Sequence, residues 1–201
     1  TRVYESAAPE YLRTHPMTVE RLSDIQNRAR ESQVRPRPDS LEFHLVRSRL
    51  RLLQDESSQG LRDSALHFRT QIEAGSAPSV AAAYYGLALA SMMLNDHAAA
   101  VDAAMKARRS SQAPSPMLDK LVAQTRFAAA KTDAERADAI RLAKEAASRY
   151  PLSRLTVLNH VDLLQRNEQH DAAGAVLRDQ LAVSRSDPKL LHLSRDALLR
   201  K

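Results

Sequence analysis

The amino-acid sequence predicts an all-α protein, and composition, periodicity and helix-start signals support this. Only four of its 201 residues are glycine and 4% are aromatic, whereas alanine, leucine and arginine are abundant. The abundant types lose little on entering a helix, and a β-sandwich would need more β-branched residues and more glycine turns. Apolar residues also recur at helical spacing in segments joined by short polar turns. We therefore expect consecutive helices to pack antiparallel as hairpins.

Charge and cysteine content reduce the number of functions that the chain could have. The chain has no cysteine, which excludes disulfides, thiolate catalysis and cysteine-bound zinc. Its net charge is +6, but 30 basic residues are interleaved with 24 acidic ones, which favours solvated helix faces over a phosphate-binding stripe. Few aromatics accompany the basic residues, so no nucleic-acid partner is expected. A basic helical nucleic-acid-binding protein stays open as an alternative.

The first two helices are marked by polar caps. Thr18 is expected to cap the first. Its apolar positions are Val19, Leu22, Ile25 and Ala29. Residues 34–38 contain two prolines and are expected to form a linker. Asp39 is predicted to cap the second helix, with Glu42 as its capping-box partner. The apolar stripe expected on that helix is Phe43, Val46, Leu50 and Leu53.

The third to fifth helices follow from similar signals. The third ends at Gly75, since glycine is favoured just past a helix end. Its apolar positions are Leu61, Ala65, Phe68 and Ile72. Ser79 is expected to cap a helix that runs to Leu94, and a tight turn leads to a helix over residues 97–109. The uncharged stretch 76–95 is about long enough to span a bilayer, but it contains proline, glycine and asparagine and its core is mostly alanine. We interpret it as a buried helix and expect no transmembrane segment.

Cap signals also open the remaining helices. Ser115 followed by Pro116 starts one that runs to about Lys131, since proline suits the first helical position. Thr132 and Glu135 form a capping box for a helix that Pro151 stops. A further pair is expected at residues 153–166 and 170–183, and a last helix after residues 187–188.

These hairpins resemble a known repeat. The segment 84–89 (Tyr-Tyr-Gly-Leu-Ala-Leu), followed by Asn95-Asp96-His97 and by Ala100 and Ala107, is similar to a tetratricopeptide repeat (TPR). The second-helix alanines recur 35, 39 and 34 residues apart, close to the repeat period of about 34. They are Ala65, Ala100, Ala139 and Ala173. The resemblance implies stacked hairpins in a right-handed superhelix. A non-repeating helical bundle is the alternative.

The N-terminal third carries a second resemblance. Residues 9–16 (Pro-Glu-Tyr-Leu-Arg-Thr-His-Pro), with 19–22, 40–43 and 46–49, look like the junction at which an M48-type zinc metalloprotease passes into its C-terminal TPR region. The similar proteins are periplasmic β-barrel assembly-enhancing proteases. The resemblance implies that residues 1–38 are the tail of the peptidase domain and a linker helix. It implies that residues 39–201 are a TPR-like domain of about four hairpins, the last one incomplete.

The zinc-binding motif of that family is missing. None of the seven histidines lies in a His-Glu-x-x-His sequence, in which two histidines on one helical face hold the metal. We therefore expect no enzyme activity and no cofactor in this chain, with zinc in a longer parent protease. The resemblance implies a periplasmic location and protein or peptide clients, outer-membrane assembly components among them. A free-standing TPR scaffold is the alternative.

Two sets of candidate site residues follow. In the resembled family the histidine that matches His15 lies near the catalytic zinc, which implies a regulatory metal ligand in the full-length protein. An ordinary loop histidine is the alternative. A mostly apolar protein-binding groove is expected on the inner wall of the repeats, where methionine and tyrosine suit adaptable contacts. Its residues are Ala82, Tyr85, Leu89, Met92, Leu155 and Leu158. Ordinary inter-helix core is the alternative for these positions.

Overall fold

A computed structural model describes residues 18–31 and 38–183, and these residues contain helices and no strand. The predicted all-α class is confirmed. The chain forms two compact units, Thr1–Pro38 and Asp39–Lys201, and each is described by itself. The helix expected after residues 187–188 lies outside the described residues.

The described part of the first unit is a single helix, α1 (Thr18–Glu31). The side chains of Leu22 and Ile25, two of its predicted apolar positions, are 57% and 64% exposed. Arg28 and Asp24 form an ion pair of 3.0 Å one turn apart on its surface. The predicted helix is therefore present, and Leu22 and Ile25 are exposed.

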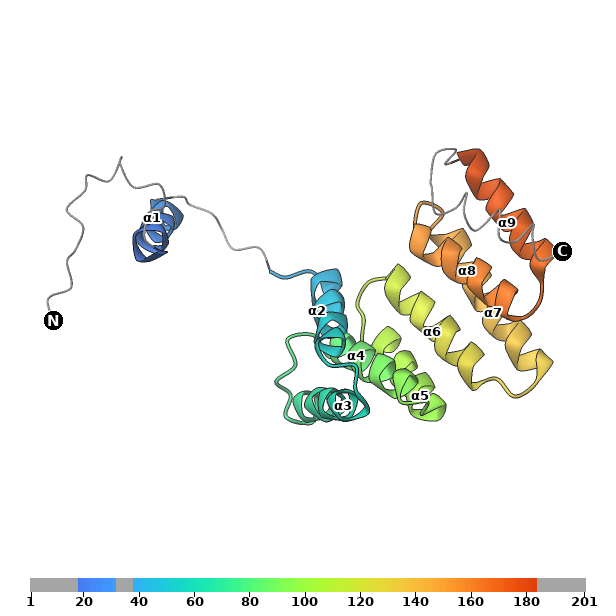
Figure 1. Ribbon diagram of the computed structural model, residues 1–201, viewed down its shortest axis with the longest axis horizontal. Helices are drawn as coiled ribbons and strands as arrows, with labels where there is room; N and C mark the ends of the chain where they lie inside the picture. The colour runs from blue at the N-terminus through green and yellow to red at the C-terminus, as the bar shows by residue number, and fades with distance from the viewer. Residues whose placement is uncertain (1–17, 32–37, 184–201) are drawn as a thin grey trace, which may run out of the picture. The chain divides into compact units, whose positions relative to one another are not determined.

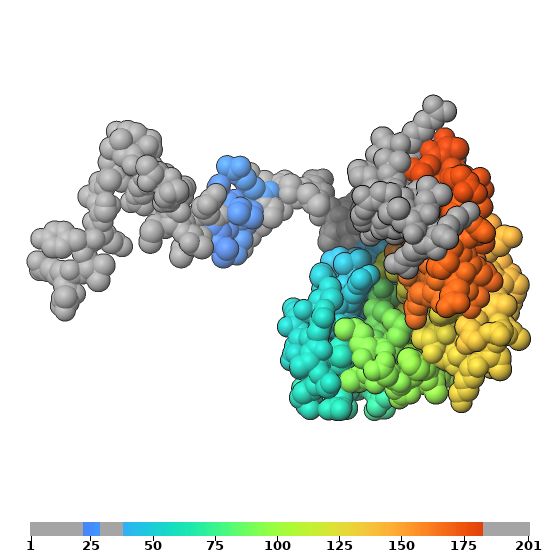
Figure 2. Space-filling view, turned by 45° about the vertical axis from the view of Figure 1, so that its right-hand side comes forward, coloured from blue at the N-terminus to red at the C-terminus, as the bar shows by residue number. Residues whose placement is uncertain are grey.

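The second unit contains eight described helices, shown in Figure 1. They are α2 (Leu41–Gln54), α3 (Ser58–Glu73), α4 (Val80–Met93), α5 (His97–Arg109), α6 (Pro116–Ala129), α7 (Asp133–Arg149), α8 (Arg154–Arg166) and α9 (His170–Val183). Helices α3 to α9 each pack against the preceding helix, and α2 packs mainly against α4. Contacts also join α4 to α6 and α6 to α8, so the even-numbered helices form one layer, and α3, α5, α7 and α9 each pack against it. This packing is consistent with a helical repeat, and Figure 2 shows successive parts of the unit side by side across one face.

The four alanines that recur in the sequence are buried in the structure. Ala100, Ala139 and Ala173 are fully buried and Ala65 is 6% exposed. A methyl side chain lets two helix axes come close, whereas a larger one would push them apart. The alanines that recur in the sequence are therefore all buried, one in each of α3, α5, α7 and α9.

Helix α2 begins and faces differently from the prediction. Its N-cap is Ser40 rather than Asp39, because the Ser40 hydroxyl accepts a hydrogen bond of 3.1 Å from the Phe43 backbone N–H. The cap is thus shifted by one residue, and the box with Glu42 does not form. The predicted apolar stripe does not face the core, since its residues are the most exposed apolar ones of the helix. They are Phe43, Val46, Leu50 and Leu53, at 45–55% exposure.

The face of α2 that is buried consists of Leu45, Ser48 and Leu52. Leu45 packs in the core cluster around α4 and α6, and Leu52 packs in the cluster around α3 and α4. Both faces of this helix carry apolar residues at helical spacing, so the spacing alone gave no means of choosing between them.

Other predicted helix ends are confirmed. Gly75 has φ of +62° and ends α3, with its N–H bound to the Ile72 carbonyl. Ser79 caps α4 through the Ala82 N–H, at 3.3 Å. Thr132 and Glu135 form the expected capping box at the start of α7. Ser115 lies at the cap position of α6, but its side chain makes no capping hydrogen bond.

Candidate protein-binding surface

Ala82 and Tyr85, the first two predicted groove residues, lie inside the helix packing. They are 3% and 4% exposed and belong to the core cluster that includes Leu45 of α2 and Leu118 of α6. Both therefore hold α4 between its neighbours in the even-numbered layer.

The hydroxyl of Tyr85 connects this core to a charged group. Burial raises the pKa of the Tyr85 phenol, and the nearby guanidinium of Arg49 on α2 opposes that rise. The buried tyrosine therefore lies close enough to a positive group for the charge to affect its hydroxyl.

The other predicted groove residues are half-buried. Leu89 and Met92 lie further along α4, and Leu155 and Leu158 lie on α8. Leu89 packs beside the cluster around α4, and Leu158 packs beside the cluster around α8 and α9. Both α4 and α8 belong to the even-numbered layer, so these four residues keep apolar surface partly exposed along one layer.

A buried carboxylate, which sequence reasoning missed, joins α5, α6 and α7. Asp119 on α6 is 8% exposed. It accepts from Arg108 Nε at 3.1 Å and from Arg149 Nη1 at 2.7 Å. The Tyr150 hydroxyl donates to the same carboxylate at 3.3 Å. Burial is the main reason that the pKa of this phenol is raised, and the negative charge of Asp119 raises it further. The Asp119 carboxylate thus accepts from three side chains, so we assign it a structural role.

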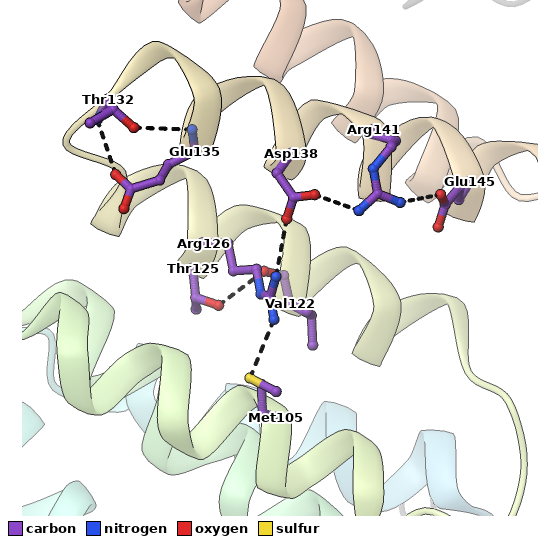
Figure 3. A network of polar contacts seen from close by, with 9 residues as sticks. All are labelled: Met105, Val122, Thr125, Arg126, Thr132, Glu135, Asp138, Arg141 and Glu145. Atoms are coloured by element: carbon purple, nitrogen blue, oxygen red, sulfur yellow. Dashed lines mark hydrogen bonds and ion pairs between the residues drawn. The ribbon is translucent and has the colours of Figure 1, made fainter.

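A second polar network surrounds Arg126 (Figure 3). Arg126 on α6 donates to Asp138 on α7 at 3.1 Å and lies 3.7 Å from the Met105 sulfur on α5. Asp138 also binds Arg141, and Arg141 reaches Glu145 one turn later. Ion pairing with Arg141 and Arg126 lowers the pKa of Asp138, with the Arg141 hydrogen bond as the largest cause. The network fixes one edge of α6 against α7.

A shallow hollow of about 290 Å³ lies between these two networks. Val122, Leu142 and Met105 provide apolar surface, and arginines border it. The borders are Arg108, Arg109 and Arg126. Arginine and methionine are enriched in protein interfaces, so the hollow is a second candidate contact area. Because its residues come from three helices, no local sequence motif marks it.

The remaining predictions concern a metal-binding site and a transmembrane helix. His15 lies outside the described residues. Within 18–31 and 38–183, no group of three or more His, Asp or Glu residues is placed to hold a metal ion. In the same ranges no helix has both the length and the apolar character needed to cross a bilayer.

Comparison with known proteins adds no family assignment. The sequence matches no protein-family model, and a search of curated proteins found no match.

Proposed function

We propose that this chain is a TPR-type protein-interaction module, in which stacked helix pairs form a right-handed superhelix with the even-numbered helices on its inner wall. The supporting observation is the recurrence of buried alanines in consecutive helix pairs, together with the contacts α2–α4, α4–α6 and α6–α8. An inner layer of this kind is the usual binding surface of helical solenoids.

Clients would bind along the half-buried apolar residues of that layer. Leu89, Met92, Leu155 and Leu158 retain partly exposed apolar surface on α4 and α8. Methionine and leucine side chains adapt to varied partners, which suits a module that binds more than one client. Ala82 and Tyr85 would support this surface from behind.

The proposed parent is a zinc-dependent M48-type metalloprotease of the periplasm. This rests on the resemblance of residues 9–16 and of the segments that follow. In that arrangement the module presents client proteins, outer-membrane assembly components among them, to a peptidase domain outside this chain. The gene tests this directly, because we expect it to encode His-Glu-x-x-His and a signal peptide upstream. A gene with neither would favour a free-standing scaffold.

His15 would act as a regulatory zinc ligand in the parent. A fourth protein ligand displaces the catalytic water and leaves the protease latent. Replacing His15 with Ala in the full-length protein is then expected to raise basal proteolysis at unchanged zinc content. Equal activity of the two proteins would make His15 an ordinary loop residue.

Client binding is tested with an immobilised peptide array of unfolded outer-membrane proteins. The substitutions Met92→Glu and Leu155→Glu place a charge on the proposed surface, and Leu66→Glu is the matched control on α3, where Leu66 is 62% exposed. We expect the first two to weaken binding at least about tenfold, roughly 1.4 kcal/mol, with little effect of the control. Equal losses in all three variants, or no bound peptide, would contradict the proposal.

A further inference from the structure

A cavity of about 440 Å³ lies between α2, α3 and the start of α4, and neither the repeat packing nor the proposed inner wall accounts for it. Helices α2 and α3 make few contacts with each other, while each packs against α4. The volume lies within the range of about 300–1,000 Å³ that is typical of small-molecule sites. Figure 1 shows α2 and α3 next to α4, at the N-terminal end of the second unit.

The polar lining of this cavity is basic. Arg47 and Arg51, one turn apart on α2, line the same wall, and no carboxylate lines it among the described residues. Neither guanidinium forms an ion pair with a described residue. This sets them apart from Arg108 and Arg149, which are held by Asp119. Two arginines with free donors on one wall can bind an oxyanion from two directions.

The opposite wall carries imidazole and amide groups. His67 and Gln71 of α3 line it, whereas His44 lines the cavity from α2, the helix that carries the two arginines. Burial lowers the pKa of His67, and the positive charges of Arg51 and Arg47 lower it further. The arginines therefore act across the cavity on the facing helix, which places the charged groups around one shared space.

The start of α4 provides the third side. Ser79, Ala82 and Ala83 line the cavity there. The N–H groups of Ala82 and Ala83 are bound to Ser79, so this end offers the hydroxyl proton of Ser79 and the partial positive charge of the helix dipole. Apolar surface from Phe68 and Leu50 borders the same space.

We propose that this cavity binds a phosphate group carried by a small molecule. A phosphate dianion accepts hydrogen bonds through three or more oxygens, which suits donors from α2, α3 and the start of α4. A carboxylate has two oxygens in one plane and would leave one of the three sides without a partner. The volume and the apolar border leave room for an organic body on the phosphate. This site is independent of the proposed protein-binding function.

The test uses the whole chain at constant ionic strength, because exposed charges are screened by salt. Inorganic phosphate, O-phosphoserine and succinate are titrated by calorimetry into the wild type, Arg47→Gln, Arg51→Gln and the double variant. Arg62→Gln is the matched control, because Arg62 is exposed on α3 and does not line the cavity. Circular dichroism and thermal melting verify that each variant is folded.

We expect the wild type to bind phosphate. Arg47→Gln, Arg51→Gln and the double variant should each bind it at least about tenfold more weakly, while Arg62→Gln binds it like the wild type. Tighter binding of O-phosphoserine than of inorganic phosphate would show that the organic body contributes. Equal affinities would show that the organic body contributes nothing and would overturn that part of the proposal. The proposal is overturned by an absence of binding, by equal weakening in Arg62→Gln, or by succinate binding as tightly as phosphate.

Discussion

The aromatic ring of Phe68 on α3 occupies the space that a side chain at Gly86 on α4 would need. A β-carbon at Gly86 would overlap the ring atoms of Phe68. Phe68 is 3% exposed and belongs to the core cluster between these helices. The pair α3–α4 thus depends on the absence of a side chain at one position.

The substitution Gly86→Ala is therefore expected to destabilise the protein. Alanine favours a helix over glycine by about 1 kcal/mol, but overpacking costs typically about 1–3 kcal/mol, so we expect a net loss. Gly174→Ala on α9 is the matched control, because a β-carbon there has its nearest neighbour, Arg178, at 3.5 Å. Urea unfolding should show a lower midpoint for Gly86→Ala and an equal or higher one for Gly174→Ala. A stabilised Gly86→Ala protein would show that Phe68 moves aside without cost.

The Asp119 cluster predicts a second loss of stability. The substitution Asp119→Asn removes the charge that pairs with Arg108 and Arg149, and we expect a loss of roughly 1–3 kcal/mol in the free energy of unfolding. Asp133→Asn is the control, because the Asp133 side chain is 95% exposed although it pairs with Arg136. Denaturant titration compares the two. Similar small effects would mean that the buried position of Asp119 adds nothing.

The fully buried Ala100 predicts an overpacking effect. The substitution Ala100→Leu is expected to lower stability by about 1–3 kcal/mol, because the added atoms have no space at this helix contact. Ala98→Leu on the exposed side of the same helix should change little. Thermal melting distinguishes the two variants, and equal midpoints would place Ala100 away from a close contact.

The buried His160 predicts a dependence of stability on pH. Burial lowers its pKa from 6.5, and the positive Lys144 lowers it further. Because the unfolded chain binds this proton more readily, the stability that neutral His160 contributes is present above about pH 6.5. It is lost as pH falls below that value, by at most about 1.4 kcal/mol per pH unit.

We expect His160→Gln to flatten the decline of the melting temperature between pH 7.5 and pH 5, and Lys144→Gln to reduce it in part. An unchanged profile in His160→Gln would assign the decline to other groups.

The helices could be predicted from the sequence, but much of the side-chain packing between them could not. Caps such as Ser79 and the box of Thr132 with Glu135 act within four residues, so their pattern is visible locally. The face of α2 was not predictable in this way, because Leu45 and Leu52 compete with an equally periodic apolar stripe. Asp119 and its partners lie up to 31 residues apart and meet only when α5, α6 and α7 pack. The basic cavity likewise combines α2 with α3 and α4.

The buried alanines have a consequence for how the second unit can bend. Alanine has no rotamers to exchange, so contacts at Ala100 and Ala139 offer little freedom to slide, and each helix pair behaves as a stiff block. A change in curvature must then occur where one block meets the next. Between the blocks α4–α5 and α6–α7 that joint is spanned by the ion pair of Arg108 with Asp119. A change in the angle between these two blocks would therefore change the distance between Arg108 Nε and the Asp119 carboxylate.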